Sequence, residues 1–213
     1  MSEAKNKLIV VSAPSGCGKG TILERVFDAD KAYYSVSCTT RKPREGEENG
    51  RHYFFITNDE FERMIADNRF LEYAGYADHY YGTPRSKVEE NLAAGKDVIL
   101  EIETKGAFQV KERRSDAILL FILPPSVKEL DRRLHKRGTE TEEVIRKRLD
   151  QAVGEIKRAY EYDYVIMNDE LEDAVRDFET VINAERNKDG SADRFRADNE
   201  DIKNMIGEVL DNA

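Results

Sequence analysis

The chain has 213 residues, a length that suits one α/β unit with insertions better than two independent domains. Its net charge of -9 argues against a nucleic-acid partner, although a local cluster of arginines can still hold one small phosphate ligand. Two cysteines and three histidines without metal-ligand spacing argue against a disulfide framework and a structural metal. The longest apolar run, Ile118 to Leu123, is too short to span a bilayer and the start is polar, so we expect a cytoplasmic protein with no membrane partner.

Short apolar runs alternate with helical patterns along the chain. Four runs are typical of buried strands: Leu8 to Val11, Asp97 to Glu101, Ala117 to Leu123 and Tyr164 to Met167. Directly after the first run, Ile22, Leu23 and Val26 recur at helical spacing. Because strands that alternate with helices pair in parallel, this order predicts an α/β fold with a parallel sheet.

Three helix starts carry capping signals, namely Ser126 with Glu129, Thr139 with Glu142, and Thr83 before Pro84. Between Tyr33 and Thr83 the pattern changes to short aromatic strands around His52 to Ile56 and Phe70 to Tyr76. A helix that carries Phe61, Met64 and Ile65 is predicted between these strands. This stretch therefore predicts an inserted α+β lobe.

The end of the chain is polar from Lys188 to Asp198 and contains Gly190. We expect this segment to leave the core. The apolar residues that follow it, at helical spacing, predict one or two amphipathic turns: Ile202, Met205, Ile206 and Val209.

A glycine-rich motif lies between the first strand and the first helix, and it resembles a P-loop. Its residues are Ala13, Pro14, Ser15, Gly16, Cys17, Gly18, Lys19, Gly20 and Thr21. In such a loop, backbone N–H groups converge on phosphate oxygens and the lysine reaches the β- and γ-phosphates. Ala13 replaces the first glycine of the usual pattern, and Gly20 replaces the usual Ser/Thr, with the hydroxyl one step later at Thr21. A plain strand-to-helix turn, the alternative, needs one glycine rather than three placed around a lysine.

A second motif runs from Ser37 to Phe55. The pair Thr40-Arg41 is followed by Arg44, an acidic residue, a glycine and then Tyr53 and Phe55. At this spacing the chain closely resembles guanylate kinases. The resemblance covers Lys7 to Arg186 and continues through these segments: Phe70 to Tyr73, Tyr80 to Thr83, Glu101 to Glu103, Arg133 to Gly138 and Ile166 to Asp169.

The residues of the second motif suit a nucleoside monophosphate. Arg41 and Arg44 carry planar guanidinium groups that suit an acceptor phosphate, and the hydroxyls of Tyr53 and Tyr81 add neutral hydrogen bonds. A guanine edge offers two donors and one acceptor, so a selective pocket needs carboxylates beside hydroxyls. Candidates for that pocket are Glu72 and Glu103 as acceptors, and Ser37 and Thr83 as donors. Glu47 joins the GMP-binding set through the resemblance alone, and a surface position for Glu72 stays open.

Further residues are assigned by the resemblance to the ATP side. Arg133 and Arg137 lie four residues apart on one predicted helix and Arg148 lies on the next, where the family has a lid that closes over ATP. The alternative for them is a charged amphipathic face. Asn168 resembles the family's adenine contact, or else is a turn residue. Glu101 ends a strand from which it could reach Mg²⁺ or its waters, although family members often carry aspartate there.

The resemblance implies a P-loop kinase core at 7–32, 84–125 and 160–186, a GMP-binding lobe at 33–83 and a lid at 126–159, within one domain spanning 7–186. The tail, 187–213, has no assigned role. The implied function is reversible transfer of the γ-phosphoryl group of Mg-ATP to GMP, which serves GMP recycling and GTP supply. The catalytic candidates are Lys19, Arg41, Arg137 and Arg148.

Two alternative functions fit these residues less well. A kinase for another monophosphate, such as AMP, conflicts with the guanine-reading set. A non-catalytic guanylate-kinase-like interaction module would lose nucleotide-loop residues, whereas Lys19 and the loop glycines are present here. Whether the protein is a monomer or a homo-oligomer is left open.

Overall fold

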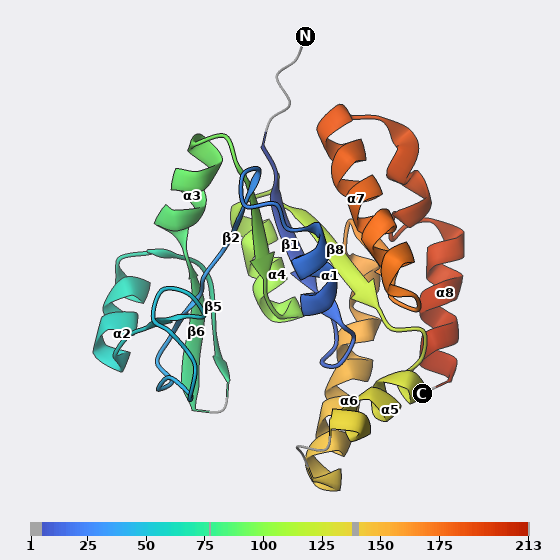
Figure 1. Ribbon diagram of the computed structural model, residues 1–213, viewed down its shortest axis with the longest axis horizontal. Coiled ribbons are helices and arrows are strands. Elements are labelled where there is room, and N and C mark those ends of the chain that lie inside the picture. Colours follow the sequence, from blue (N-terminus) through green and yellow to red (C-terminus); the bar gives the residue numbers. More distant parts are fainter. Residues whose placement is uncertain (1–5, 77, 138–140, 213) are drawn as a thin grey trace. The chain divides into compact units, whose positions relative to one another are not determined.

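The computed structural model describes residues 6–76, 78–137 and 141–212, which fall into two compact units (Figure 1). Unit 1 contains Val11–Phe27 and Ile118–Ala213, and unit 2 contains Asn6–Val10 and Asp28–Ala117. The first strand, β1 (Leu8–Ser12), contributes to both units. None of the helices in the described ranges is long and apolar enough to cross a membrane.

Unit 1 is built on the strand order β1-β8-β9. The strands β8 (Ile118–Leu123) and β9 (Tyr164–Met167) are parallel, from Leu120 opposite Tyr164 to Leu123 opposite Met167. Every residue of β8 is buried, as expected for a continuous apolar run in a parallel sheet. The predicted strands of this unit are therefore confirmed, apart from Ala117, which precedes β8.

Helices surround these strands in unit 1 (Figure 1). They are α1 (Lys19–Val26), α5 (Val127–Arg137), α6 (Glu142–Lys157), α7 (Leu171–Asn187) and α8 (Glu200–Asp211), with short 3-10 turns η1 (Ala159–Glu161) and η2 (Gly190–Phe195). The predicted cap at Ser126 is confirmed, because its Oγ accepts from Glu129 N at 3.0 Å. Thr139 lies outside the described residues, and Thr141 occupies the N-cap position of α6.

The C-terminal segment does not leave the core, so our expectation for it was wrong. Phe195 in η2 and Ile202, Ile206 and Val209 in α8 are all buried, and α8 contacts α6 and η1. The polar stretch is joined to the start of β9 as well: Arg196 forms an antiparallel bridge with Tyr164, and Ala197 N donates to the carbonyl of Asp163, just before the strand, at 3.2 Å. The polar residues of 188–198 outnumber its apolar ones, so the sequence concealed the few side chains that anchor it.

Unit 2 contains the strand order β2-β7-β1 and a second, four-stranded sheet. The strand β2 (Ala32–Tyr34) pairs in parallel with β7 (Asp97–Glu101), so Tyr33, which we placed in the inserted lobe, lies in the parallel sheet. The sequence pattern did not reveal β2, because a strand of three residues is too short to show a periodicity. The helices α3 (Arg85–Ala93) and α4 (Thr104–Arg113) flank β7 in the sequence.

The second sheet has the order β4-β3-β6-β5, formed by β4 (Phe54–Phe55), β3 (Cys38–Thr39), β6 (His79–Pro84) and β5 (Phe70–Tyr76). The helix α2 (Asn58–Ala66) packs with it around a core of Cys38, Phe61, Met64 and Phe70. This confirms the predicted α+β character of the stretch. Thr83 is not a helix cap, because it lies in β6 and Pro84 occupies the N-cap position of α3.

Burial of α8 makes a testable claim about the C-terminal segment. Replacing Val209, which is 2% exposed, by Ala removes two buried methyl groups and should lower the free energy of unfolding by about 2 kcal/mol. The matched control is Val144→Ala on α6, where Val144 is 40% exposed and a change below about 0.5 kcal/mol is expected. Urea unfolding measures both; equal, small effects would show that α8 is not part of the core.

Candidate functional site

The glycine-rich loop joins β1 to α1 through two residues in the left-handed region. Gly16 and Gly18 both have φ of +89°, which a side chain would strain. Cys17 N closes the turn by donating to the Pro14 carbonyl at 3.1 Å, and Gly18 is the N-cap residue of α1. The first N–H groups of α1 have no partner within the helix, and the helix dipole favours an anion there. The loop is therefore built to receive a phosphate.

The loop is packed against α5. A Cβ atom on Gly16 would lie 3.3 Å from Leu134 Cδ2, and both Leu130 and Leu134 are buried. Glycine at this position therefore lets the loop and the helix approach closely. Lys19 is the first residue of α1, and Gly20 and Thr21 are exposed on its first turn.

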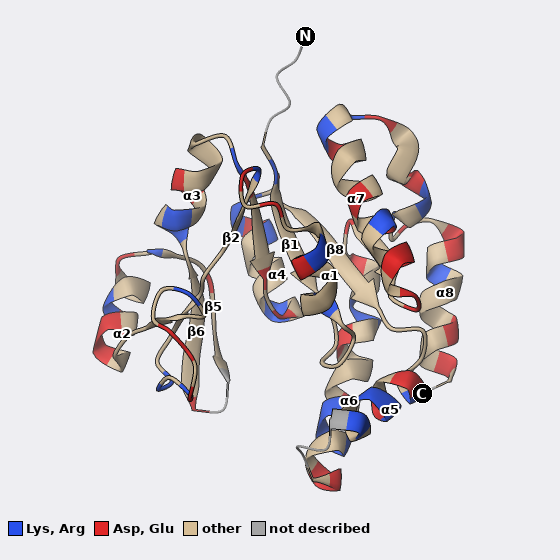
Figure 2. Cartoon of the chain, in the orientation of Figure 1, with Lys and Arg blue, Asp and Glu red and all other residues tan. Residues whose placement is uncertain are grey.

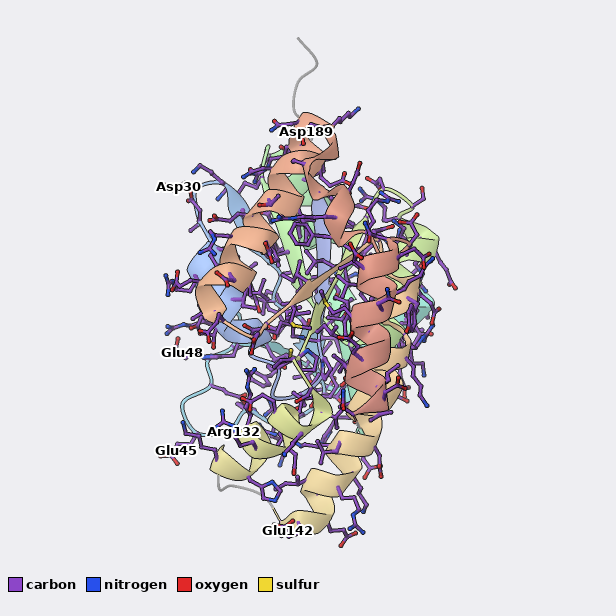
Figure 3. All side chains as sticks on the ribbon, turned by 90° about the vertical axis from the view of Figure 1, so that its right-hand side faces the viewer. Asp30, Glu45, Glu48, Arg132, Glu142 and Asp189 are labelled. Carbon is purple, nitrogen blue, oxygen red and sulfur yellow. The ribbon has the colours of Figure 1, made fainter. Side chains whose placement is uncertain are left out.

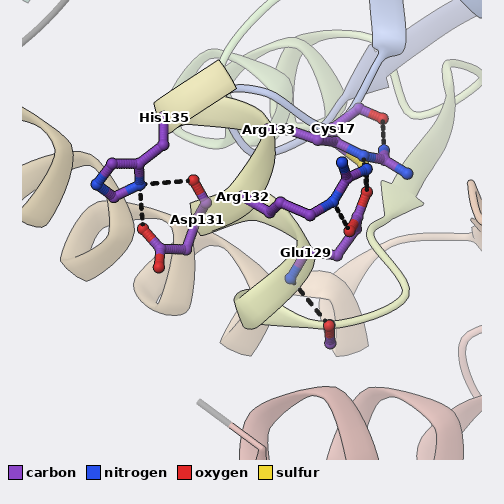
Figure 4. Close-up of polar contacts among 7 residues, drawn as sticks. Cys17, Glu129, Asp131, Arg132, Arg133 and His135 are labelled. Carbon is purple, nitrogen blue, oxygen red and sulfur yellow. Dashed lines mark hydrogen bonds and ion pairs between the residues drawn. The ribbon is translucent and has the colours of Figure 1, made fainter. Parts of the chain in front are cut away.

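Arg133 of α5 reaches the loop from that helix (Figure 4). Its Nη1 donates to the Cys17 carbonyl at 3.4 Å, and its Nε donates to Glu129 Oε1 at 2.8 Å. Hydrogen bonds from Arg132 and Arg133 lower the pKa of Glu129 to about 2. Arg133 is thus held by a carboxylate in a position that touches the loop backbone.

Of the two remaining lid candidates, Arg148 has a described side chain and Arg137 does not. Arg148 of α6 donates from Nη1 to Ser15 Oγ at 3.0 Å, so it lies at the loop. The side chain of Arg137 and residue Gly138 lie outside the described residues. Both acidic and basic residues lie on α5 and α6 (Figure 2), and the labelled Arg132 and Glu142 (Figure 3) have side chains that are 64% and 84% exposed. These helices therefore carry both a charged, exposed face and arginines that contact the loop.

Asn168 follows β9 and also contacts the loop. Its side chain is 6% exposed, and Nδ2 donates to the Cys17 carbonyl at 2.6 Å. The Cys17 thiol donates to the Ile122 carbonyl at 3.4 Å, and burial raises its pKa to about 12. Burial likewise raises the pKa of Cys38 in unit 2 to about 12. Both thiols are therefore neutral at physiological pH and suit packing rather than redox chemistry.

In unit 2, Arg41 is held by Glu47. Arg41 Nη1 and Nη2 donate to the two carboxylate oxygens of Glu47, each at 2.8 Å, and Arg44 N donates to the same carboxylate at 2.7 Å. The hydrogen bond from Arg41 is the main cause that lowers the pKa of Glu47 to about 2. The neighbouring Glu45 and Glu48 are exposed (Figure 3), so one glutamate of three organises this turn.

Two tyrosines complete this group. The rings of Tyr53 and Tyr81 meet edge to face with centroids 5.9 Å apart, and the Arg41 guanidinium lies 5.4 Å from the centroid of Tyr53. Burial raises the pKa of Tyr53, which keeps its hydroxyl protonated as a donor. Arg44 is exposed. The structure thus brings together Arg41, Glu47, Tyr53 and Tyr81, as an anion clamp would require.

Glu72 is buried, so its surface alternative was wrong. It is 5% exposed on β5 and accepts from Thr83 Oγ on β6 at 2.6 Å. Burial raises the pKa of Glu72 to about 7, and the nearby Glu103 carboxylate adds to this, while the bond from Thr83 opposes it. Carboxylate and hydroxyl therefore form one buried pair on adjacent strands.

Two residues that sequence reasoning missed shape the surroundings of Glu72. A Cβ on Gly106 would lie 2.7 Å from Glu72 Oε2, so only glycine leaves space for the carboxylate. Arg113 Nη1 donates to the Phe70 and Leu71 carbonyls, each at 2.8 Å, and fixes the backbone before Glu72. A glycine inside a helical pattern, as at Gly106, can mark a close contact, so the sequence did carry a signal at this position. No sequence pattern marked Arg113.

The other acceptor-side candidates are less tightly placed. Glu103 is exposed at the N-cap of α4, and Ser37 is half-buried with its carbonyl accepting from Phe54 N at 2.9 Å. The Tyr34 hydroxyl of β2 donates to the carboxylate of Glu101 at the end of β7. Tyr34 lies in the short strand that the sequence pattern did not reveal.

The raised pKa of Glu72 makes stability depend on pH. Because the folded pKa of about 7 exceeds the ordinary glutamate pKa of 4.5, the folded state binds the proton more tightly, and stability from this group is lost as pH rises through 7. Glu72→Gln has no such titration. Its unfolding free energy relative to the wild type should therefore rise between pH 5 and pH 8, by up to roughly 3 kcal/mol. Urea unfolding at both pH values measures this, and a pH-independent difference would contradict the buried acid.

A glycine-rich loop between a parallel strand and a helix, with arginines from following helices beside it, defines a P-loop nucleotide-binding protein. The family model described as Guanylate kinase matches residues 5–185. The guanylate kinase of Thermus thermophilus is 48% identical over 89% of this chain and 85% of that protein. The guanylate kinase of Escherichia coli is 48% identical over 86% of this chain and 90% of its own. The chain belongs to the guanylate kinase family.

A solved structure agrees with this assignment. The crystal structure of guanylate kinase from Anaplasma phagocytophilum superposes with a TM-score of 0.69 at 33% identity, covering 87% of this chain and 89% of that one. The predicted α/β fold with a parallel sheet and a P-loop kinase core is confirmed.

Proposed function

We propose that this chain, as a member of the guanylate kinase family, catalyses reversible transfer of the γ-phosphoryl group from ATP to GMP, giving ADP and GDP, through the residues assigned below. The observation that carries the acceptor assignment is the arrangement on β6. Tyr81 and Thr83 alternate by two along this strand, so they share one face, and Glu72 lies directly opposite Thr83. A phosphate-binding phenol and a base-reading pair thus stand about 7 Å apart along the strand.

On the acceptor side, Arg41, Arg44 and the tyrosines hold the GMP phosphate, while Glu72 and Thr83 read the guanine. An ionised Glu72 accepts from the guanine N1–H and N2 amino group, and Thr83, Ser37 and Glu103 complete the edge. Glu47 acts through Arg41, which it holds by two hydrogen bonds, rather than through the phosphate. Adenine offers the wrong donor pattern and leaves the buried carboxylate without the two donors that guanine would supply.

On the donor side, the loop N–H groups and Lys19 hold the ATP phosphates. Arg148, with Arg133 and Arg137, neutralises charge that develops on the transferred group. No residue of the chain needs to form a covalent bond with the phosphoryl group, because in-line transfer between two bound nucleotides requires positioning and charge neutralisation only. Exclusion of water on binding protects ATP from hydrolysis.

Mg²⁺ is expected to enter with ATP. Among the residues that the structure describes, no three His, Cys, Asp or Glu side chains are grouped to hold a metal ion. In phosphoryl-transfer enzymes Mg²⁺ is bound mainly by substrate phosphates with one or two carboxylates and several waters. Glu101, held by the Tyr34 hydroxyl, would contact its waters. When bound, the ion supplies charge neutralisation between the β- and γ-phosphates. A cytoplasmic location and the division into core, lobe and lid stay predictions.

Lys19→Met tests the phosphate loop. Removing the preorganised ammonium should lower kcat at least a hundredfold while the fold is kept, because Lys19 begins α1 at the surface of the loop. A coupled assay of ADP formation with and without GMP measures activity, and circular dichroism checks the fold. Lys7→Met, outside the loop, is the control and should keep activity. Near-normal turnover of folded Lys19→Met would remove the assignment of the loop.

Glu72→Gln tests the guanine pocket. The amide keeps the shape but loses one charge-assisted acceptor, so kcat/KM for GMP should fall roughly tenfold to hundredfold. The dissociation constant for ATP should stay within twofold of the wild type. Glu62→Gln on the exposed side of α2 is the matched control and should leave both values unchanged. Unchanged use of GMP by folded Glu72→Gln would mean that the pocket is misplaced.

A further inference from the structure

The carbonyl oxygen of Cys17 is the point where three parts of unit 1 meet. It belongs to the phosphate loop, and it accepts from Asn168 Nδ2 at 2.6 Å and from Arg133 Nη1 at 3.4 Å. Asn168 is itself fixed by the sheet, because its backbone N donates to the Leu123 carbonyl at 2.8 Å and so continues the pairing of β8 with β9. A rigid element therefore holds one peptide of the loop.

Gly18 lies against the side-chain amide of Asn168. A Cβ atom on Gly18 would lie 2.6 Å from Asn168 Nδ2, closer than a Cβ atom approaches other heavy atoms, and Gly18 has φ of +89°. The loop therefore folds directly over the amide group. With 6% of Asn168 exposed, its N–H donor is committed to the loop backbone and not to solvent.

We propose that Asn168 is a positioning residue of the phosphate loop, which acts by orienting the peptide between Cys17 and Gly18. In a trans peptide the C=O and N–H groups point in opposite directions. Holding the Cys17 carbonyl toward Asn168 therefore turns the Gly18 N–H away from the sheet, to the side where the loop receives phosphate oxygens. Arg133 acts on the same carbonyl and is aligned by Glu129.

This role differs from the adenine contact that the family resemblance implies for Asn168. A base contact would affect only ligands that carry adenine, whereas a positioned peptide affects every ligand that carries the phosphate chain. The inference rests on the proposed donor-phosphate role of residues 13–21. A ligand that has phosphates and no base therefore distinguishes the positioning role from the adenine contact.

Asn168→Asp is the sharpest variant, because it keeps the shape and one oxygen acceptor but replaces the N–H donor by an oxygen facing the Cys17 carbonyl. We expect the dissociation constant of ATP and the inhibition constant of inorganic tripolyphosphate against ATP to rise by the same factor, roughly tenfold to hundredfold. KM for GMP at saturating ATP should not change. The loss should shrink toward pH 5, since a protonated carboxyl can donate to the carbonyl again.

Asn204→Asp on the exposed part of α8 is the control, because it makes the same chemical change and adds the same charge. If Asn168→Asp does not fold, Asn168→Ala removes the donor without adding charge, and it is measured in the same way. Weaker binding of ATP with unchanged tripolyphosphate inhibition would overturn the proposal in favour of an adenine contact. Unchanged values for both ligands would overturn it as well. Lys19→Met distinguishes the two failures: if it is inactive while Asn168→Asp is normal, only the positioning role is wrong.

Discussion

The orientation of the backbone between β1 and α1 is the constraint on which the donor side depends. A phosphate can be held by N–H groups only if consecutive peptides turn the same way, and two glycines at φ of +89° make that turn possible. The remaining contacts of the loop serve this geometry: Leu134 packs on Gly16, and Asn168 and Arg133 hold the Cys17 carbonyl. The helix α5 and the residue after β9 therefore stabilise the backbone conformation of the loop.

Charged side chains in both units are held by contacts within the protein. Arg41 is held by Glu47 and Arg133 by Glu129, each through hydrogen bonds that lower the pKa of the carboxyl group to about 2. A guanidinium held by a carboxylate has lost rotamer freedom already, so less entropy is lost when it meets a phosphate. The carboxylate also reduces the repulsion among neighbouring cations. Arginines without such partners would be more mobile and would bind an anion with less geometric selectivity.

Glu72 shows the opposite arrangement, a carboxyl group whose burial raises its pKa to about 7. No guanidinium pairs with its carboxylate in the contacts described, and Thr83 is its hydrogen-bond donor. In the proposed GMP site, guanine would bring two N–H donors that favour the charged form, so ligand binding and proton release would be coupled at this residue. The absence of a Cβ on Gly106 makes the arrangement sterically possible.

The sequence by itself determined the strands β1, β7, β8 and β9, the glycine-rich loop, the family and a set of candidate polar residues for a nucleotide site. These follow from local pattern: apolar runs such as Ile118–Leu123 form strands, and glycines around a lysine form a loop, whatever else surrounds them. Only the tertiary structure decided which partner each side chain has. Glu47 holds Arg41, whereas Glu45 and Glu48 do not; Asn168 holds the loop; and α8 is buried. Each of these features depends on contacts between residues far apart in the chain or on the exact path of a turn. Periodicity and spacing carry no information on such contacts, because burial and hydrogen bonding arise only when the elements pack.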